Sequence, residues 1–197
     1  KIEDEKSERG YLTQIEVETL MNWELDKKLE QTRDVFIFCC FTGLSYIDVF
    51  KLTREQIQLS IDGQLWIMGK REKTDMDYFI PMMEIPKKIL EKYKNQTFKN
   101  GKILPVKTSV MVNRHLKEIA KVCGIEKHLT FHLSRHTFAT LTMSKGVSLE
   151  SVSKMLGHKN IRTTQIYAKM TTEKVGRDMA IFAESIKETE RKFVVNF

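Results

Sequence analysis

The sequence has few cysteines and no long apolar segment. Its 3 cysteines, Cys39, Cys40 and Cys123, are odd in number, lack the spacing of metal ligands and sit in apolar or helical surroundings. We expect free thiols that fill the core of a protein in a reducing, intracellular compartment. No apolar run approaches the roughly 20 residues that a membrane span needs, and no signal peptide opens the sequence. We therefore expect a cytoplasmic protein that does not contact a membrane.

The sequence also lacks an acidic excess and any cluster of Asp and Glu that resembles a two-metal nuclease site. Lys and Arg number 33 against 26 Asp and Glu, so the formal net charge is +7 and the pI is near 9.2. This charge favours a polyanionic partner, although an ordinary basic protein would also carry it. A length of 197 residues with 41% hydrophobic content predicts one well-packed domain with a loosely attached end.

Helical periodicity and helix caps dominate the chain from residue 11 onward. Thr13 followed by Glu16 forms a capping box at the start of a first helix. Residues 35–44 are apolar on nearly every side and end near Gly43, which predicts a buried helix, with a buried strand as the alternative. A short helical segment follows and closes where Thr53 and Gln56 repeat the capping pattern. Further helices are predicted over residues 86–94, 110–123 with Ser109 as the cap, 132–145, 148–156, 162–167 and 172–189, the last with Val175, Met179, Phe182 and Ile186 on one stripe.

Between Ile57 and Pro81 the pattern changes to short segments rich in β-branched and aromatic residues. Asp62-Gly63 provides a tight turn between the first two segments, so a small antiparallel sheet is predicted. The connection to the third segment is a basic hairpin, with Lys70, Arg71 and Lys73 against Glu72. The predicted fold class is therefore α+β, mostly helical with one small antiparallel sheet.

The candidate chemistry lies in residues 130–167. His132 and Arg135 are three positions apart, so on a helix both side chains share one face and reach a single anion. An arginine fork matches two phosphate oxygens, and an imidazole accepts a proton or donates a hydrogen bond. The alternative is an interior histidine with a surface arginine, because so short a motif also arises by chance.

The second half of this stretch adds a histidine and a tyrosine. Gly157 permits a sharp turn that aims His158 at a site, and Tyr167 follows nine residues later, far enough along to enter from a separate helix. A phenol with a pKa of about 10 is a poor nucleophile at neutral pH, so it needs neighbouring cations or a base. His132, Arg135 and His158 would supply them. Tyr167 taken alone is equally consistent with a half-buried aromatic residue.

The segment HLSRHTFATLTMSKGVSLESVSKMLGHKNIRTTQIY closely resembles the C-terminal motif of the tyrosine recombinases, the phage integrase family, in HxxR, LGH, TTQxY and the nine-residue gap. Upstream, FTGLSYIDVFKLT resembles the family's first motif, and the basic hairpin resembles its lysine-bearing one. The resemblance implies the family's catalytic-domain fold over residues 11–170, with residues 171–197 as a C-terminal helix and tail. Residues 1–10 are charged, polar and without an initiator methionine, and we interpret them as a linker from a missing N-terminal DNA-binding region.

The resemblance implies a site-specific recombinase or integrase of a mobile element, acting on double-stranded DNA without a metal or other cofactor. Tyr167 would attack a DNA phosphate and form a 3′-phosphotyrosyl link. Arg135 would stabilise the charged pentacoordinate phosphorus. His132 would assist proton transfer from the tyrosine, and His158 would hydrogen-bond the phosphate.

The hairpin and the first motif match the family only in part. Lys73 matches the family's hairpin lysine in spacing and would protonate the leaving 5′ oxygen, unless it is a solvated turn residue and Lys70 takes that role. Ser45 stands where the family has an arginine, while Asp48 matches the acidic position that supports the active site. A serine cannot replace a guanidinium fork, so either activity is reduced or another cation fills the gap. Arg71 is the first candidate because it would share a face with Lys73 on an extended strand, and Arg54 and Arg114 are weaker candidates.

Two classes of function remain open on this sequence. The first is an enzyme, for which a type IB topoisomerase fits the motifs less well than a recombinase. The second is a DNA-binding protein that has lost cleavage, and Ser45 favours it. The free chain is expected to be a monomer that binds DNA weakly, and to form a tetrameric synapse on DNA through its C-terminal tail, close to the bacterial nucleoid. The alternative for the tail is to fold back on its own core.

Overall fold

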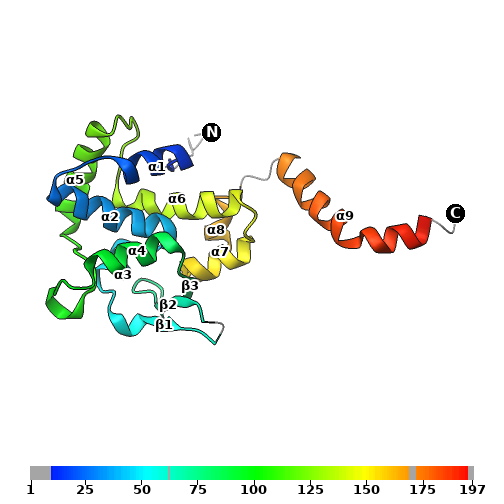
Figure 1. Ribbon diagram of the computed structural model, residues 1–197, viewed down its shortest axis with the longest axis horizontal. Coiled ribbons are helices and arrows are strands. Elements are labelled where there is room, and N and C mark those ends of the chain that lie inside the picture. The colour runs from blue at the N-terminus through cyan, green and yellow to red at the C-terminus, as the bar shows by residue number, and fades with distance from the viewer. Residues whose placement is uncertain (1–9, 62, 169–171, 195–197) are drawn as a thin grey trace, which may run out of the picture. The chain divides into compact units, whose positions relative to one another are not determined.

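The computed structural model describes residues 10–61, 63–168 and 172–194, which fall into two compact units (Figure 1). One unit ends at Tyr167 and the other begins at Ala168. The helices of the first unit are α1 (Gln14–Asn22), α2 (Lys27–Thr42), α3 (Tyr46–Phe50), α4 (Glu84–Tyr93), α5 (Ser109–Val122), α6 (Phe131–Ser144), α7 (Leu149–Leu156) and α8 (Arg162–Gln165), with short 3-10 helices η1 (Arg54–Gln56) and η2 (Lys99–Gly101). The second unit contains α9 (Thr172–Val194). No helix within the described ranges is long and apolar enough to cross a membrane.

The sheet of the first unit has the three strands β1 (Ile57–Leu59), β2 (Leu65–Lys70) and β3 (Asp77–Pro81) in sequence order. Both pairs are antiparallel, and Ile67 lies opposite Ile57 on one side and Ile80 on the other. Ile67 and Ile80 are buried, so the face that carries them packs on the helices. The predicted α+β fold is confirmed. Gly63, the second residue of the predicted tight turn, has a positive φ of 77°. Its neighbour Asp62 lies outside the described residues.

Helix α2 is the centre of the core and packs against α1, α4, α5 and α6. Its second half is buried at every position except Phe41, which is partly buried, as its continuous apolar sequence predicts, so the strand alternative was wrong. Gly43 ends the helix with φ of 69°, and a β-carbon there would lie 2.5 Å from the Phe138 ring. The helix also begins earlier than residue 35, because Asp26 caps it by accepting hydrogen bonds from the amides of Lys28 and Leu29. All 3 cysteines are buried and free, as expected.

Local capping explains most of the other helix boundaries. The capping box of Thr13 and Glu16 is confirmed, and α7, predicted over residues 148–156, is capped by the side chain of Ser148. The cap assigned to Ser109 was wrong by one position, since Thr108 is extended and its hydroxyl accepts from the amide of Met111. Helix α8 ends at Gln165, before Tyr167, and α9 continues to Val194.

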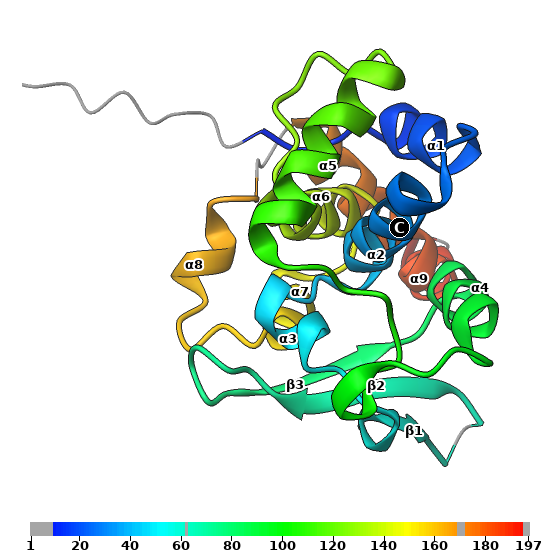
Figure 2. The same ribbon diagram turned by 90° about the vertical axis from the view of Figure 1, so that its left-hand side faces the viewer.

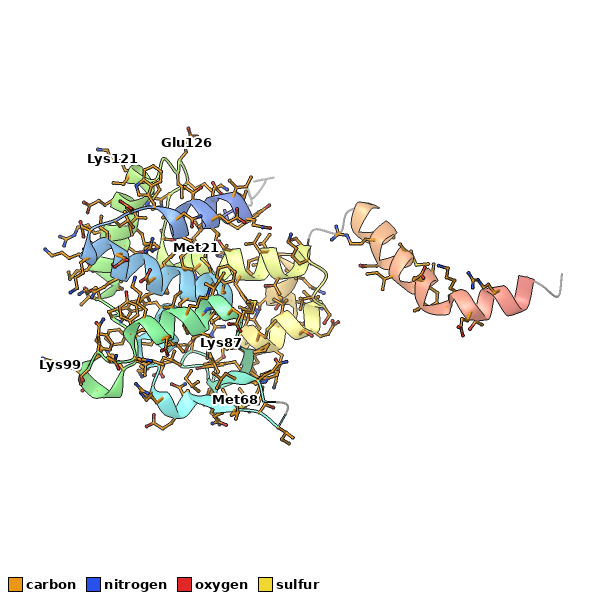
Figure 3. The ribbon with its side chains drawn as sticks, in the orientation of Figure 1. Met21, Met68, Lys87, Lys99, Lys121 and Glu126 are labelled. Atoms are coloured by element: carbon orange, nitrogen blue, oxygen red, sulfur yellow. The ribbon has the colours of Figure 1, made fainter. Side chains whose placement is uncertain are left out.

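The layers of the first unit place α7 between α6 and the sheet, in contact with both α6 and β3 (Figure 2). Figures 1 and 2 both show the sheet on one side and α2, α5 and α6 on the other. In Figure 3, Lys121 and Glu126 mark the far end of the helical layer and Met68 marks the sheet. The C-terminus of α7 therefore meets the C-terminus of α2 and the β2–β3 hairpin, and the residues of the candidate site gather there.

Helix α9 is a single amphipathic helix in its own unit. Of its predicted stripe, Val175, Met179 and Phe182 are about half exposed (49%, 56% and 53%), and Ile186 is partly buried. Charged residues such as Arg177 and Glu184 occupy other faces of the helix.

Candidate active site

Arg135 is the most deeply buried charged residue of the candidate site, with 3% of its surface exposed. It lies on α6, which begins at Phe131. The backbone amide of Phe131 donates a 2.9 Å hydrogen bond to the side-chain oxygen of Asn113 on α5. The guanidinium donates from Nη1 to the carbonyl of Gly43 at 2.6 Å and from Nη2 to the carbonyl of Leu156 at 2.5 Å. These carbonyls end α2 and α7, where the helix dipoles favour a cation. The arginine fork is therefore held in one orientation.

The electrostatic environment of Arg135 contains a second guanidinium. Burial, followed by the positive charge of Arg71, lowers the pKa of Arg135 to about 9, while Asp48 and Tyr167 act in the opposite direction. At neutral pH Arg135 still carries its charge. Two cations held close together favour a nearby anion.

Arg71 follows β2 directly and reaches the same carbonyl as Arg135. Its Nη1 donates to the oxygen of Leu156 at 3.3 Å, and its Nε is buried with no hydrogen-bond partner in the described part of the chain. Burial lowers the pKa of Arg71, and the negative forms of Asp48 and Tyr167 oppose that shift. The strand argument for Arg71 was wrong, since β2 ends at Lys70 and residues 72–74 form a turn. Arg71 reaches the site because the chain leaves the strand and packs on Gly157.

Asp48 and Ser45 connect α3 to the basic hairpin. Asp48 is buried, with 5% of its surface exposed, and accepts a 2.5 Å hydrogen bond from the hydroxyl of Ser45. Its other carboxylate oxygen accepts from the backbone amide of Glu72 at 3.1 Å. Ser45 also caps α3 by accepting from the amide of Asp48. Ser45 thus contributes a helix cap, and Asp48 holds the hairpin turn in place.

Lys73 lies in the hairpin turn and is exposed to solvent. The hydroxyl of its neighbour Thr74 donates a 3.1 Å hydrogen bond to the carbonyl of Gly157. Together with the bond from Arg71 to the carbonyl of Leu156, this contact attaches the turn to the end of α7. No hydrogen bond or ion pair joins Lys73 to another described residue of the site. The competing Lys70 is 65% exposed and lies 3.9 Å from the carboxylate of Asp75.

His158 follows the αL residue Gly157, as the sequence predicted. Its Nδ1 lies 2.7 Å from the hydroxyl of Thr164 on α8. Burial, then the charges of Arg135 and Arg71, lower the pKa of His158 to about 4. The imidazole is therefore neutral at physiological pH, and it lies close to both guanidinium groups.

Tyr167 is half-buried and packs against the apolar cluster of α6 and α7. Its ring lies 5.1 Å from that of His136, and His136 in turn makes an edge-on contact with His132 at 4.3 Å between centroids. His132 is exposed on α6, one turn before the buried His136. The four residues of the central motif thus lie near one another. Arg135 is close enough to His158 to lower the pKa of the imidazole, and the ring of His136 contacts both His132 and Tyr167.

Several contacts of this site could not be predicted from the sequence, although Thr164 itself lies within the TTQxY motif. Thr164, Thr74, His136 and Asn113 act by contacts with residues that local spacing does not relate to them, and only a fold brings these together. The weaker arginine candidates lie elsewhere: Arg54 donates to the carbonyl of Lys94, and Arg114 is exposed on α5.

The site is partly exposed to solvent, since His132 and Lys73 are exposed and His158 and Tyr167 are half-buried. A hollow of about 910 Å³ exists between α4, the first strands and residues 94–103, and none of the site residues lines it. Within the described ranges, no group of three or more His, Cys, Asp or Glu side chains is placed to hold a metal ion. The arrangement can bind a tetrahedral anion of a large ligand beside a phenol.

Fold and site together define a helical domain that presents a tyrosine beside paired arginines, the arrangement expected of the tyrosine recombinases. The model of the Phage integrase family matches residues 10–174, and the chain belongs to this family. Tyrosine recombinase XerD of Listeria innocua is 34% identical over 143 residues, which cover 66% of this chain and 47% of that protein. Its counterpart in Oceanobacillus iheyensis is 29% identical over 199 residues, 90% of this chain and 64% of that one. The chain thus spans about half to two thirds of the length of these relatives.

Solved structures show the same fold. A XerH recombinase bound to its difH substrate in a post-cleavage complex has a TM-score of 0.69 at 21% identity, covering 88% of this chain and 53% of that one. The Tn1549 transposon integrase in complex with transposon right end DNA has a TM-score of 0.66 at 18% identity, covering 92% and 69%. At these identities the likeness establishes the fold alone.

Proposed function

We propose that this chain is the catalytic domain of a site-specific recombinase that cleaves and rejoins double-stranded DNA through a covalent link to Tyr167. One observation carries the proposal: Arg135 and Arg71 donate to the same carbonyl oxygen, and Tyr167 lies within electrostatic reach of both. Two guanidinium groups on one neutral acceptor repel each other, so a bound phosphate stabilises the arrangement. The nucleophile and the anion site belong to the same chain.

The choice of DNA as the partner is supported by the charge and the shape of the site. The chain carries a formal net charge of +7, and the site is open to solvent on the side of the exposed Lys73. A long polyanion can lie on such a surface, whereas a small molecule would need an enclosed pocket. The XerH and Tn1549 integrase structures hold DNA, in agreement with this choice.

The chemical step is a transesterification at one phosphate. The Tyr167 oxygen forms a bond to phosphorus, the bond from phosphorus to the 5′ oxygen breaks, and a 3′-phosphotyrosyl link results. His132 assists the transfer of the phenol proton, and Lys73 gives a proton to the leaving 5′ oxygen. Arg135 and His158 hydrogen-bond the phosphoryl oxygens, whose negative charge rises in the transition state. A returning 5′ hydroxyl reverses these steps and rejoins the strand, without any cofactor.

Arg71 takes the place of the arginine that the family has at the position of Ser45. It shares the Leu156 carbonyl with Arg135, and its buried Nε donor has no partner in the described part of the chain. A buried donor without a partner raises the free energy of the free protein, and a phosphate oxygen can satisfy it. The second fork of the phosphate pocket thus comes from the hairpin and not from the start of α3.

A DNA-binding protein without cleavage activity is the second candidate, and Ser45 favours it. A suicide DNA substrate with a nick near the cleavage site separates the two, because the short cleaved fragment diffuses away and the covalent complex accumulates. The recombinase proposal requires an adduct that forms with the unchanged chain and disappears in Tyr167→Phe. If the unchanged chain binds the same DNA without forming an adduct, only the second candidate remains.

The assembly is proposed to be a monomer in the absence of DNA and a tetramer on DNA, joined through the C-terminal helix. Its support is the apolar stripe of α9, where Val175, Met179 and Phe182 are about half exposed. We also propose that the protein belongs to a mobile element, as does the Tn1549 transposon integrase that shares its fold, and that it acts in the cytoplasm. Light scattering with and without DNA, repeated for Phe182→Asp, tests the assembly. Unchanged tetramers in that variant would exclude this role for the stripe.

A further inference from the structure

Thr164 is a fully buried residue of α8, with 0% of its surface exposed, and it contacts both His158 and the chain at Tyr167. Its hydroxyl lies 2.7 Å from Nδ1 of His158, and its carbonyl accepts a hydrogen bond from the amide of Tyr167 at 3.0 Å. We propose that Thr164 is a positioning residue whose hydroxyl donates a hydrogen bond to Nδ1 of His158 and thereby keeps the proton of the imidazole on Nε2. This inference rests on the proposed function, since it assigns how His158 meets the phosphate.

The direction of this hydrogen bond follows from counting protons. A neutral imidazole carries one N–H, and a threonine hydroxyl carries one O–H. In the described part of the chain, Nδ1 of His158 is the one hydrogen-bond partner of the Thr164 hydroxyl. If Nδ1 carried the proton, the hydroxyl would accept, and its own proton would remain unpaired in a buried place, which costs free energy. Donation from Thr164 to Nδ1 satisfies both groups.

The charges around His158 make this choice of tautomer matter. Arg135 faces the ring from α6 and Arg71 faces it from the hairpin, and both are cations that, after burial, disfavour the imidazolium. A doubly protonated ring would donate from both nitrogens whatever Thr164 did. Because the ring stays neutral, it has a single N–H, and Thr164 decides which edge of the ring carries it.

The consequence for the reaction is a fixed donor in the phosphate pocket. With Nδ1 occupied by Thr164, the edge that bears Nε2–H is free to donate to a phosphoryl oxygen, whose charge grows in the transition state. The opposite tautomer would present a lone pair to the same oxygen and repel it. Thr164 therefore acts through His158 and does not itself touch the DNA.

The tautomer is measured directly by long-range ¹H–¹⁵N spectroscopy of the ¹⁵N-histidine-labelled chain at neutral pH. The sequence contains 5 histidines, and the signals lost in His158→Asn assign the ring of interest. The proposal expects Nδ1 unprotonated and Nε2 protonated in the unchanged chain. Thr164→Val removes the donor while keeping the shape, and should move the proton toward Nδ1, whereas Thr164→Ser should keep it on Nε2. A protonated Nδ1 in the unchanged chain overturns the proposal even if the variants do not fold.

Cleavage kinetics on the nicked substrate provide the second readout. At saturating enzyme, Thr164→Val should slow adduct formation by about 10- to 100-fold, with DNA affinity unchanged within about twofold, and Thr164→Ser should restore most of the rate. The exposed neighbour supplies the matched control, since Thr163→Val should leave the rate unchanged. An unchanged rate in Thr164→Val contradicts the inference while leaving the proposed function intact. Absence of any adduct in the unchanged chain refutes the proposed function. The tautomer measurement still tests the hydrogen bond from Thr164 to His158, because it does not depend on cleavage.

Discussion

Replacing Arg71 by alanine is the perturbation that separates an active recombinase from an inactive relative. The guanidinium lies on the Leu156 carbonyl beside Arg135 and has a buried Nε donor without a partner in the described ranges. A charge-assisted hydrogen bond contributes about 1.5 to 3 kcal/mol, and about 1.4 kcal/mol corresponds to a tenfold change in rate. Arg71→Ala should therefore slow cleavage by about 10- to 150-fold.

The folded state should change little in this variant. The bond from Arg71 to Leu156 is long, at 3.3 Å, and removing the cation also relieves its repulsion with Arg135. The free energy of unfolding should therefore shift by less than about 1 kcal/mol, so that the rate reports on chemistry and not on folding. Urea denaturation of both chains checks this condition.

The assay is single-turnover formation of the covalent complex on a nicked suicide substrate at saturating protein. The cleavage rate of Arg71→Lys should fall between those of the unchanged chain and Arg71→Ala, because lysine keeps the positive charge and lacks the guanidinium fork. Arg54→Ala is the matched control, since Arg54 bonds to Lys94 away from the site and its loss should not change the rate. Because the family has an arginine at position 45, adding Ser45→Arg to Arg71→Ala should restore cleavage. A rate for Arg71→Ala within about threefold of the unchanged chain would refute the assignment.

Three further predictions follow from buried contacts. Asp48→Ala removes the acceptor of the Glu72 amide hydrogen bond, so the free energy of unfolding should fall by about 1 to 3 kcal/mol. Amide hydrogen exchange in the hairpin should become faster, and an exchange rate equal to that of the unchanged chain would contradict this prediction. Gly43→Ala should destabilise by more than about 1 kcal/mol, since its β-carbon would lie 2.5 Å from Phe138 at a positive φ, and an unchanged melting temperature would be inconsistent. His158 has its folded pKa lowered to about 4, so its contribution to stability is present above the unfolded pKa and is lost as pH falls from about 6.5 towards 4. Solvent screening of the half-exposed ring limits this contribution to the free energy of unfolding to roughly 1 to 2 kcal/mol. In His158→Gln, the urea midpoint should therefore depend less on pH between about 6.5 and 4 than it does in the unchanged chain.

The sequence predicted the elements of the fold wherever a local rule determined them. Gly43 and Gly157 ended helices as expected because each adopts a left-handed conformation that a glycine permits. The capping box of Thr13 and the apolar run of α2 were equally readable. The cap at Thr108 was missed by one residue, because Thr108 and Ser109 carry the same capping hydroxyl and only the backbone angles tell them apart.

The candidate site was harder to predict, because it depends on contacts between distant segments. Spacing together with the resemblance to the tyrosine recombinases selected His132, Arg135, His158 and Tyr167, and their roles remain predictions. Arg71 was selected for a wrong reason, since the strand ends before it, and its approach to Leu156 crosses 85 positions of sequence. The Thr164 contact with His158 was not predicted, although Thr164 belongs to the TTQxY motif, since a threonine near a histidine has no preferred geometry until a fold fixes it.

The central claim is that Tyr167 forms a covalent bond to a DNA phosphate. The most direct measurement is mass spectrometry of the protein after reaction with a nicked suicide substrate, followed by digestion and mapping of the nucleotide-linked peptide. The account predicts one adduct, joined through a 3′ phosphate to Tyr167 and absent from Tyr167→Phe. An adduct on another residue, or none with a substrate that the chain demonstrably binds, would contradict it.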